Sequence, residues 1–321
     1  MKNFPVIVIV GPTSSGKSAL AVRLARQFGG EIISADSRQV YRGLDIGSGK
    51  VTRDQTKNSK LKAKGYLHQG IPHHLLDVAN PRRTFTVAQY QKLGTRALEQ
   101  IIKRGKVPII CGGTGFYIDA LLGRVAIPSV PPNQALRTKL EKLSTEKLFS
   151  KLQTLDKTRA ENIDRHNRRR LIRAIEIAIT SPKGSTFLPQ GRTLTCKTLT
   201  CKNIWLTIGI KLKPEKLREK INARLKFRID HGLIAEVKKL HENGLSWRRL
   251  DALGLEYRFV AKLLQREPRR GGVKREEIAG LERNIWHYAK RQMTWWKRDK
   301  TIYWIKNYRE AEQLTRDFLK K

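Results

Sequence analysis

Three kinds of feature are scarce in this 321-residue chain: long hydrophobic runs, cysteines and acidic residues. No stretch approaches the roughly 18 apolar residues of a membrane-spanning helix, and the N-terminus leads almost at once into a strand-like segment, so we expect neither a membrane span nor a signal peptide. The cysteines, Cys111, Cys196 and Cys201, are too few for a disulfide framework and lack the second ligand pair of a zinc site. We therefore expect structural thiols in a cytoplasmic protein that has no membrane partner.

The scarcity of acidic residues leaves the chain strongly basic. Lys and Arg number 66 against 28 Asp and Glu, which gives a formal net charge of +38. This excess is larger than solubility requires, and it indicates a polyanionic partner, with nucleic acid as the first candidate. A basic bias of the whole proteome is the alternative, because the charge is spread along the chain. Hydrophobic residues make up 39% of the sequence, which is enough for a core.

The clearest motif lies near the N-terminus, where a buried-strand pattern over 6–10 leads into a glycine-rich loop and then a helix. The loop matches G-x-x-x-x-G-K-[ST], and we assign pyrophosphate or nucleotide binding to all of its residues: Gly11, Pro12, Thr13, Ser14, Ser15, Gly16, Lys17 and Ser18. The glycines let N–H groups face phosphate oxygens, the lysine adds positive charge, and the Ser18 hydroxyl is a ligand type for Mg²⁺. The motif predicts a site for a di- or triphosphate.

Strand-like and helical segments alternate after this loop. Strand patterns over 31–35 and 107–111 end in Asp36 and in the glycine-rich segment 112–115, and the segment 87–103 is helical in pattern. This alternation predicts an α/β fold: a parallel sheet like that of P-loop NTPases, with flanking helices. Ligands of such sheets bind beyond the carboxyl ends of the strands, so Asp36 and Thr114 should lie beside the phosphate loop.

The α/β pattern stops at the proline-rich segment 127–132. We expect a first core part over 1–126, an all-helical insertion over 127–198 and a completion of the core over 199–321 with a helical, basic C-terminal region. The insertion includes a return linker over 182–192 and a half-buried strand pattern over 193–202. After a strand over 203–210, the remainder is expected to be helical.

Two helices carry arginines in an informative register. In the insertion, Leu171, Ile175 and Ile179 share one helix face, while Arg169 and Arg173 share another; a solvated basic face and an RNA contact are both open. The helix over 214–230 places Arg224 and Arg228 together at the flank of an apolar stripe formed by Leu217, Ile221 and Leu225. An arginine there can cover the core or reach a phosphate.

The segment 288–298 interleaves cations with aromatic residues. Nucleic-acid surfaces favour this composition, because bases stack on aromatic rings while cations meet the backbone. A core helix with its tryptophans turned inward is the alternative.

Six blocks occur in a fixed order along the chain: 11–18, 36–47, 72–77, 112–118, 170–176 and 289–295. Together they closely resemble the tRNA dimethylallyltransferases, also called tRNA isopentenyltransferases. The resemblance implies a prenyltransferase that moves a dimethylallyl group from dimethylallyl pyrophosphate to N6 of the adenosine immediately 3′ of a tRNA anticodon. It implies Mg²⁺ as cofactor and the tRNA anticodon stem-loop as partner, and we expect a monomer.

The resemblance also implies residue roles. The catalytic set is Asp36, Thr114 and Arg224: Asp36 as the base for the N6 proton, Thr114 as donor to the bridging oxygen, and Arg224 as a contact of the pyrophosphate. A second-shell Mg²⁺ role for Asp36, a turn hydroxyl at Thr114 and a helix-flank position for Arg224 are the alternatives. The residues implied in tRNA binding are Asp36, Ser37, Arg38, Gln39, Thr114, Arg137, Arg169, Arg170, Leu171, Ile172, Arg173, Lys290, Arg291, Gln292, Trp295 and Lys297.

The chain departs from the family pattern at two places. Members commonly carry Met at the position of Arg228, and Ile-Gly-Tyr-Lys-Glu where this chain has Leu-Gly-Leu-Glu-Tyr-Arg at 253–258. These departures affect the expected RNA contacts more than the expected reaction. The pair His73 and His74 matches a family block, and we interpret it as structural.

Other functions fit parts of the sequence. A small-molecule kinase would use the same phosphate loop, but it leaves the blocks at 112–115 and 290–298 without a role. An isopentenyltransferase that acts on free adenine nucleotides would not need the basic insertion. A non-catalytic RNA-binding NTPase would bind RNA in an ATP-dependent way and form no prenyl product.

Overall fold

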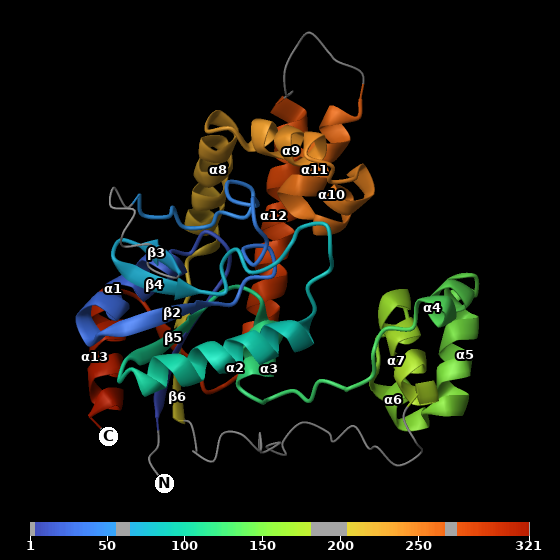
Figure 1. The fold of residues 1–321 in the computed structure, drawn as a ribbon, viewed down its shortest axis with the longest axis horizontal. Helices are drawn as coiled ribbons and strands as arrows, with labels where there is room; N and C mark the ends of the chain where they lie inside the picture. Colours follow the sequence, from blue (N-terminus) through green and yellow to red (C-terminus); the bar gives the residue numbers. More distant parts are fainter. Residues whose placement is uncertain (1–3, 56–64, 181–203, 267–274, 321) are drawn as a thin grey trace. The chain divides into compact units, whose positions relative to one another are not determined.

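A computed structural model of the chain describes residues 4–55, 65–180, 204–266 and 275–320. The chain divides into two compact units, one formed by 1–123 with 195–321 and the other by 124–194 (Figure 1). The expected return linker and the strand pattern over 193–202, with Cys196 and Cys201, lie outside the described residues. None of the helices in the described ranges is long and apolar enough to cross a membrane.

The first unit is built on a seven-stranded sheet with the strand order β3-β4-β2-β5-β1-β6-β7. All neighbouring strands are parallel except β3 and β4, which form an antiparallel pair. The predicted α/β fold with a mostly parallel sheet is confirmed. The strands are β1 (Pro5–Val10), β2 (Gly30–Ser34), β3 (Tyr66–His68), β4 (Ile71–His74), β5 (Val107–Cys111), β6 (Ile204–Ile210) and β7 (Tyr303–Ile305).

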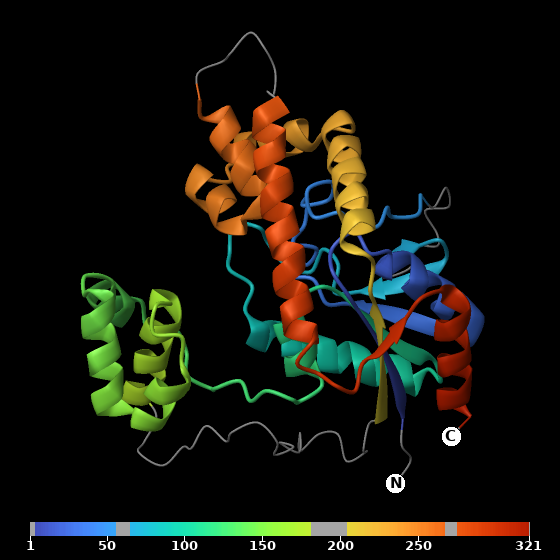
Figure 2. The same cartoon turned by 180° about the vertical axis from the view of Figure 1, so that it is seen from behind.

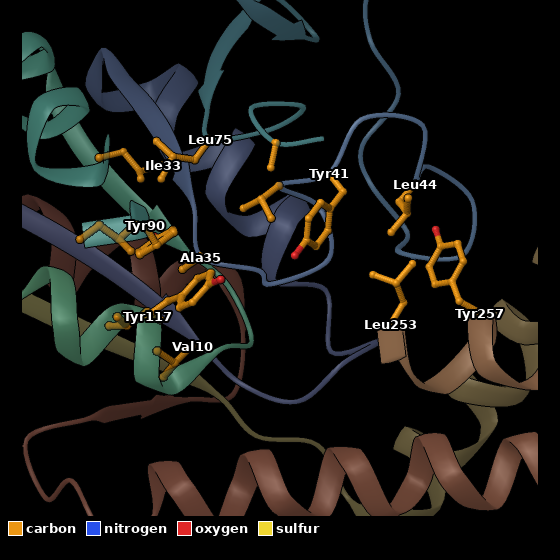
Figure 3. Packing of buried hydrophobic residues seen from close by; sticks show 14 of the residues in the cluster. Val10, Ile33, Ala35, Tyr41, Leu44, Leu75, Tyr90, Tyr117, Leu253 and Tyr257 are labelled. Atoms are coloured by element: carbon orange, nitrogen blue, oxygen red, sulfur yellow. The ribbon is translucent and has the colours of Figure 1, made fainter. Parts of the chain in front are cut away.

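Helices cover both faces of this sheet. Strand β1 is hydrophobic along its whole length because its side chains are buried on both faces. Successive side chains of a strand point to opposite faces, so Val6, Val8 and Val10 pack in one core cluster while Ile7 and Ile9 pack in another. The second cluster is closed by α1 (Lys17–Phe28) and α13 (Tyr308–Leu319). The first cluster contains α2 (Val87–Lys103) and α3 (Gly115–Leu121), whose rings Tyr90 and Tyr117 stack with centroids 4.0 Å apart (Figure 3).

The C-terminal helices extend this first cluster. They are α8 (Pro214–Asp230), α9 (Leu233–Glu242), α10 (Trp247–Leu253), α11 (Leu255–Leu264) and α12 (Arg275–Trp296). The predicted apolar stripe of α8 is buried, and α12 packs against α8, as Figure 2 shows from behind. In Figure 3, Leu253 and Tyr257 face Leu44 across the junction with the loop after β2. The expectation of helices alone after β6 is wrong: β7 adds a parallel strand at the sheet edge, because Tyr303–Ile305 pairs with the end of β6.

The second unit is helical, and its described part contains α4 (Gln134–Glu141), α5 (Thr145–Leu155), α6 (Lys157–Asn162) and α7 (Arg168–Thr180). Its core includes four fully buried side chains, Leu148, Leu152, Leu171 and Ile175. Ile179 does not join this core, because it is 48% exposed near the end of α7.

Candidate active site

The phosphate loop connects β1 to α1 at the carboxyl edge of the sheet. Gly11 and Gly16 have φ angles of +144° and +95°, and Ser14 has a φ of +62°. These left-handed angles turn successive N–H groups in one direction, as in anion-binding backbone nests. A Cβ on Gly11 would lie 2.8 Å from the carbonyl oxygen of Ile210, so a side chain does not fit there. The geometry agrees with the anion site that the motif predicts.

Two polar groups of this loop are available for an anion. The Ser15 hydroxyl is buried and has no hydrogen-bond partner in the described structure. Lys17 donates to the carbonyl of Pro12 at 2.5 Å. Burial lowers the pKa of Lys17 to about 8, and Arg224 acts in the same direction while Asp36 opposes it. A bound phosphate would satisfy the hydroxyl and would favour the charged ammonium.

The loop is tied to the end of β5 by Gln292 of α12. The Oε1 of Gln292 accepts the N–H of Thr13 at 2.8 Å, and its Nε2 donates to the carbonyl of Gly113 at 2.9 Å. A Cβ on Gly113 would lie 2.2 Å from that Nε2, which explains a glycine at this position. Gln292 is buried, with 6% of its surface exposed. Both the oxygen and the nitrogen of its amide therefore hydrogen-bond to backbone groups of the protein.

Asp36 and Thr114 meet beyond the ends of β2 and β5. The Oδ1 of Asp36 accepts the N–H groups of Arg38 at 2.8 Å and of Gln39 at 3.3 Å. These bonds orient the carboxylate and leave Oδ2 without a hydrogen bond from the described residues. The Thr114 hydroxyl accepts the N–H of Ser37 at 3.0 Å, so its own proton is free to be donated. The segment after β5 joins the two strand ends: the N–H of Gly112 donates to the carbonyl of Ile9 and that of Thr114 to the carbonyl of Ala35, which places Asp36 at the same edge as the phosphate loop.

Arg224 approaches the same place from α8. Its Nη2 donates to the carbonyl of Gly49 at 3.1 Å. Burial lowers the pKa of Arg224 to about 10, repulsion from Arg228 adds to this effect, and attraction to Glu256 and Asp36 opposes it. The guanidinium remains charged at neutral pH. Its predicted position near the phosphate loop agrees with its electrostatic influence on Lys17.

The loop that carries Gly49 is held by charged side chains, Glu236 and Lys50, that the sequence motifs did not single out. The carboxylate of Glu236 on α9 accepts three consecutive N–H groups, of residues 45–47, at 2.6–3.1 Å, and it accepts the O–H of Tyr257 at 2.9 Å. No alternation or spacing in the sequence links Glu236 to a loop some 190 residues away, which is why inspection of motifs missed it.

Lys50 holds the other end of this loop. Its ammonium is buried and contacts Asp45 at 2.5 Å, Asp77 and the carbonyl of Tyr41. Two carboxylates around one ammonium compensate the loss of its hydration. Asp45 and Asp77 belong to two blocks of the family resemblance, and the structure shows that this lysine joins them.

The surroundings of Ser18 fit a cation that prefers oxygen ligands. Ser18 is exposed in the first turn of α1, and it lines a cavity of about 20 Å³ whose other polar residues are Ser34, Gln39 and His73 and whose remaining lining is apolar or a thiol. Among the residues that the structure describes, no cluster of three His, Cys, Asp or Glu side chains could hold a metal. A cation here would take the Ser18 hydroxyl, oxygens of a bound phosphate and water, as Mg²⁺ commonly does.

The histidine pair has a structural arrangement. His74 contacts Glu31 at 2.6 Å, and Arg104 binds the same carboxylate with two hydrogen bonds. His73 is buried, burial lowers its pKa, and its Nδ1 lies 2.9 Å from the carbonyl of Ile71. These contacts agree with the structural interpretation of the pair.

Cations and aromatics lie beside one another on α12 (Arg275–Trp296): Lys290 and Arg291 each lie 6.0 Å from a ring centroid, of Trp286 and of Tyr288 respectively. Lys290, Arg291 and Lys297 are exposed, whereas Trp296 is buried at 1% exposure. Trp295 is half-buried, and its Nε1 donates to Asp119 at 3.1 Å. One tryptophan is therefore part of the core, as the alternative expected, and the cations face solvent, while RNA contact by this segment stays a prediction. Beside Thr114, the residues Ser37, Arg38 and Gln39 are partly exposed.

In the helical unit, the predicted RNA contacts differ in their surroundings. Arg169 and Arg170 are exposed, while Leu171 and Ile172 pack in the core with 0% and 8% exposure. Arg137 and Arg173 both bind the carboxylate of Glu176, which is fully buried. Burial raises the pKa of Glu176, but hydrogen bonds from Arg137, the backbone of Asn133 and Arg173 outweigh this and lower it to about 2.

Comparisons with known proteins agree with this geometry. The family model described as IPP transferase matches residues 39–299, and the model described as isopentenyl transferase matches residues 4–73. The tRNA dimethylallyltransferase of Anoxybacillus flavithermus is 38% identical over 305 residues, which cover 94% of this chain and 89% of that protein.

Solved structures are also similar. The tRNA delta(2)-isopentenylpyrophosphate transferase of Staphylococcus epidermidis is 32% identical with a TM-score of 0.64, and the match covers 100% of both chains. A eukaryotic dimethylallyltransferase acting on tRNA is 25% identical with a TM-score of 0.69, over 92% of this chain and 70% of that one.

Proposed function

Because this chain belongs to the IPP transferase family of tRNA dimethylallyltransferases, we propose that it transfers a dimethylallyl group from dimethylallyl pyrophosphate to N6 of the adenosine immediately 3′ of the anticodon in tRNA. The observation that carries this proposal is the meeting of an anion-binding loop with a fixed carboxylate, Asp36, at one edge of the sheet. A diphosphate and a proton acceptor are both needed in this reaction, and they are needed side by side.

The leaving group is stabilised by the phosphate loop and Arg224. As the bond between the allylic carbon and oxygen breaks, the pyrophosphate keeps the electron pair, and its charge increases. Loop N–H groups, the buried Ser15 hydroxyl, Lys17 and the Arg224 guanidinium stabilise that charge, and the proton of Thr114 is donated to the bridging oxygen. A Mg²⁺ ion would be held by the Ser18 hydroxyl, and it would supply further positive charge beside the pyrophosphate.

Asp36 takes the proton from N6. Nitrogen forms its bond to the allylic carbon, and the N–H proton passes to the free Oδ2 of the carboxylate, whose orientation is fixed by the N–H groups of Arg38 and Gln39. General-base assistance of this kind contributes roughly 10²- to 10⁴-fold.

The tRNA is held by cations from both units. An adenosine in an anticodon loop is extruded from its stack before it reaches Asp36, and this costs a few kcal/mol, which RNA contacts offset. In the unit of 1–123 with 195–321, exposed cations on α12 and just after it supply those contacts: Lys290, Arg291 and Lys297. In the helical unit of 124–194, Arg169 and Arg170 of α7 do so. We assign the enzyme to the cytoplasm as a monomer.

One experiment tests the function. The protein is incubated with dimethylallyl pyrophosphate, Mg²⁺ and bulk unmodified tRNA, and the digested tRNA is analysed by mass spectrometry for isopentenyladenosine. Parallel reactions contain AMP in place of tRNA, or ATP in place of the prenyl donor. A prenylated AMP, or phosphoryl transfer from ATP without a prenyl product, would contradict the proposal.

A further inference from the structure

A buried ion pair lies directly beside Arg224. The Nη1 of Arg228, one turn further along α8, is 2.6 Å from the Oε1 of Glu256 on α11. Arg228 and Glu256 are 7% exposed each. An exposed ion pair contributes little to stability and does not fix its side chains. A buried pair fixes both side chains, because either charge alone would be strongly disfavoured there.

The two arginines crowd against a single backbone position. A Cβ on Gly49 would lie 2.0 Å from an Nη2 of Arg224 and 2.0 Å from an Nη2 of Arg228. The two guanidinium groups are therefore no more than about 4 Å apart, a distance at which like charges repel and a shared carboxylate attracts both. Glu256 is that carboxylate: it pairs with Arg228, and it also interacts electrostatically with Arg224.

The backbone holds Glu256 in this position. It lies directly after Leu255, whose φ of +41° is unfavourable for a bulky residue, at the sharp turn between α10 and α11. The next residue, Tyr257, is tied to Glu236 by its hydroxyl. The turn thus fixes the position of Glu256. Its carboxylate can attract either guanidinium group, that of Arg224 or that of Arg228, and in this structure it pairs with Arg228.

We propose that Arg228 is a positioning residue: by occupying Glu256, it leaves the guanidinium of Arg224 available to the pyrophosphate instead of neutralised within the protein. A carboxylate at 256 without a cation at 228 would compete with the substrate for Arg224, because Glu256 already attracts that guanidinium.

The inference rests on the proposed function, and a binding measurement separates the two. Inorganic pyrophosphate is titrated by calorimetry into the wild type, Arg228→Met, Glu256→Gln and the double variant, with thermal unfolding followed for each. We expect Arg228→Met to weaken pyrophosphate binding about tenfold or more, which is the loss of one hydrogen-bonded charge. Glu256→Gln in that background restores the affinity to within about threefold of wild type. Arg258→Met is the matched control and leaves affinity unchanged, because Arg258 lies on α11, as Glu256 does, but forms an exposed pair with Asp251 of α10.

Each other outcome is decisive. If the double variant stays as weak as Arg228→Met, Arg228 itself contacts the anion and the positioning role is wrong. If Arg228→Met lowers the unfolding temperature but leaves the pyrophosphate affinity of the folded protein intact, the pair is merely structural. Prenyl transfer by the wild type is measured in parallel: if pyrophosphate binds as described but no isopentenyladenosine forms, the proposed function fails while this inference stands.

Discussion

Gln292 offers a direct test of how the phosphate loop is held. The resemblance assigns this residue to tRNA binding, but its amide is buried and joins Thr13 to Gly113. We expect Gln292→Ala to damage the donor site and to leave RNA binding largely intact. The reason is that the substitution removes the only side chain of the described residues that hydrogen-bonds to both of these loops.

The magnitude follows from two hydrogen bonds. Each contributes about 1 kcal/mol net, so the free energy of unfolding should fall by about 2 kcal/mol. For a unit of this size the midpoint of thermal unfolding should drop by roughly 4–8 °C. The loop N–H groups are no longer aligned in advance, and we expect the Kd for dimethylallyl pyrophosphate to rise about tenfold, which corresponds to about 1.4 kcal/mol.

The assays are circular dichroism for unfolding, calorimetry for the donor and filter binding for tRNA. Lys290→Ala is the matched control on the same helix, because this side chain is exposed. We expect Lys290→Ala to weaken tRNA binding and to reduce the salt dependence of that binding, while donor affinity and stability stay unchanged. A Gln292→Ala variant with weakened tRNA binding but intact donor affinity would refute the bridging role and would indicate that Gln292 contacts tRNA.

Three further predictions concern single charges. Asp36→Asn should reduce kcat by roughly 10²- to 10⁴-fold with the Kd for the donor and Mg²⁺ unchanged; a loss of metal affinity would instead favour a metal-linked role. Donor affinity should fall as pH rises through about 8, because the free lysine at position 17 then loses its charge, and calorimetric titrations at pH 7 and pH 9 should show no such fall in Lys17→Met. The pKa of Glu176 is lowered to about 2, so its contribution to stability is present above about 4.5, is lost as pH falls toward 2 and amounts to roughly 3 kcal/mol. Acid unfolding of Glu176→Gln should lack that component, and an unchanged acid midpoint would contradict it.

The sequence by itself determined the parts of the protein that depend on local pattern. The run of apolar residues before Gly11 predicts a buried strand, the glycines and Lys17 predict the anion loop, and the helices over 87–103 and 214–230 begin and end as expected. The register of α8 also places Arg224 and Arg228 together. These features repeat every two or 3.6 residues or follow from backbone angles, so neighbouring residues are sufficient to specify them.

Tertiary structure decided what joins distant segments. Which arginine of α8 pairs with Glu256, which lysine binds Asp45 and Asp77, and that Glu236 caps the loop before Gly49 all depend on side chains brought together from far along the chain. The short edge strand β7 likewise exists because β6 offers it a partner. Ion pairs and edge strands leave no periodic signal, because their energy depends on burial and on the partner's position, and only the folded chain supplies both.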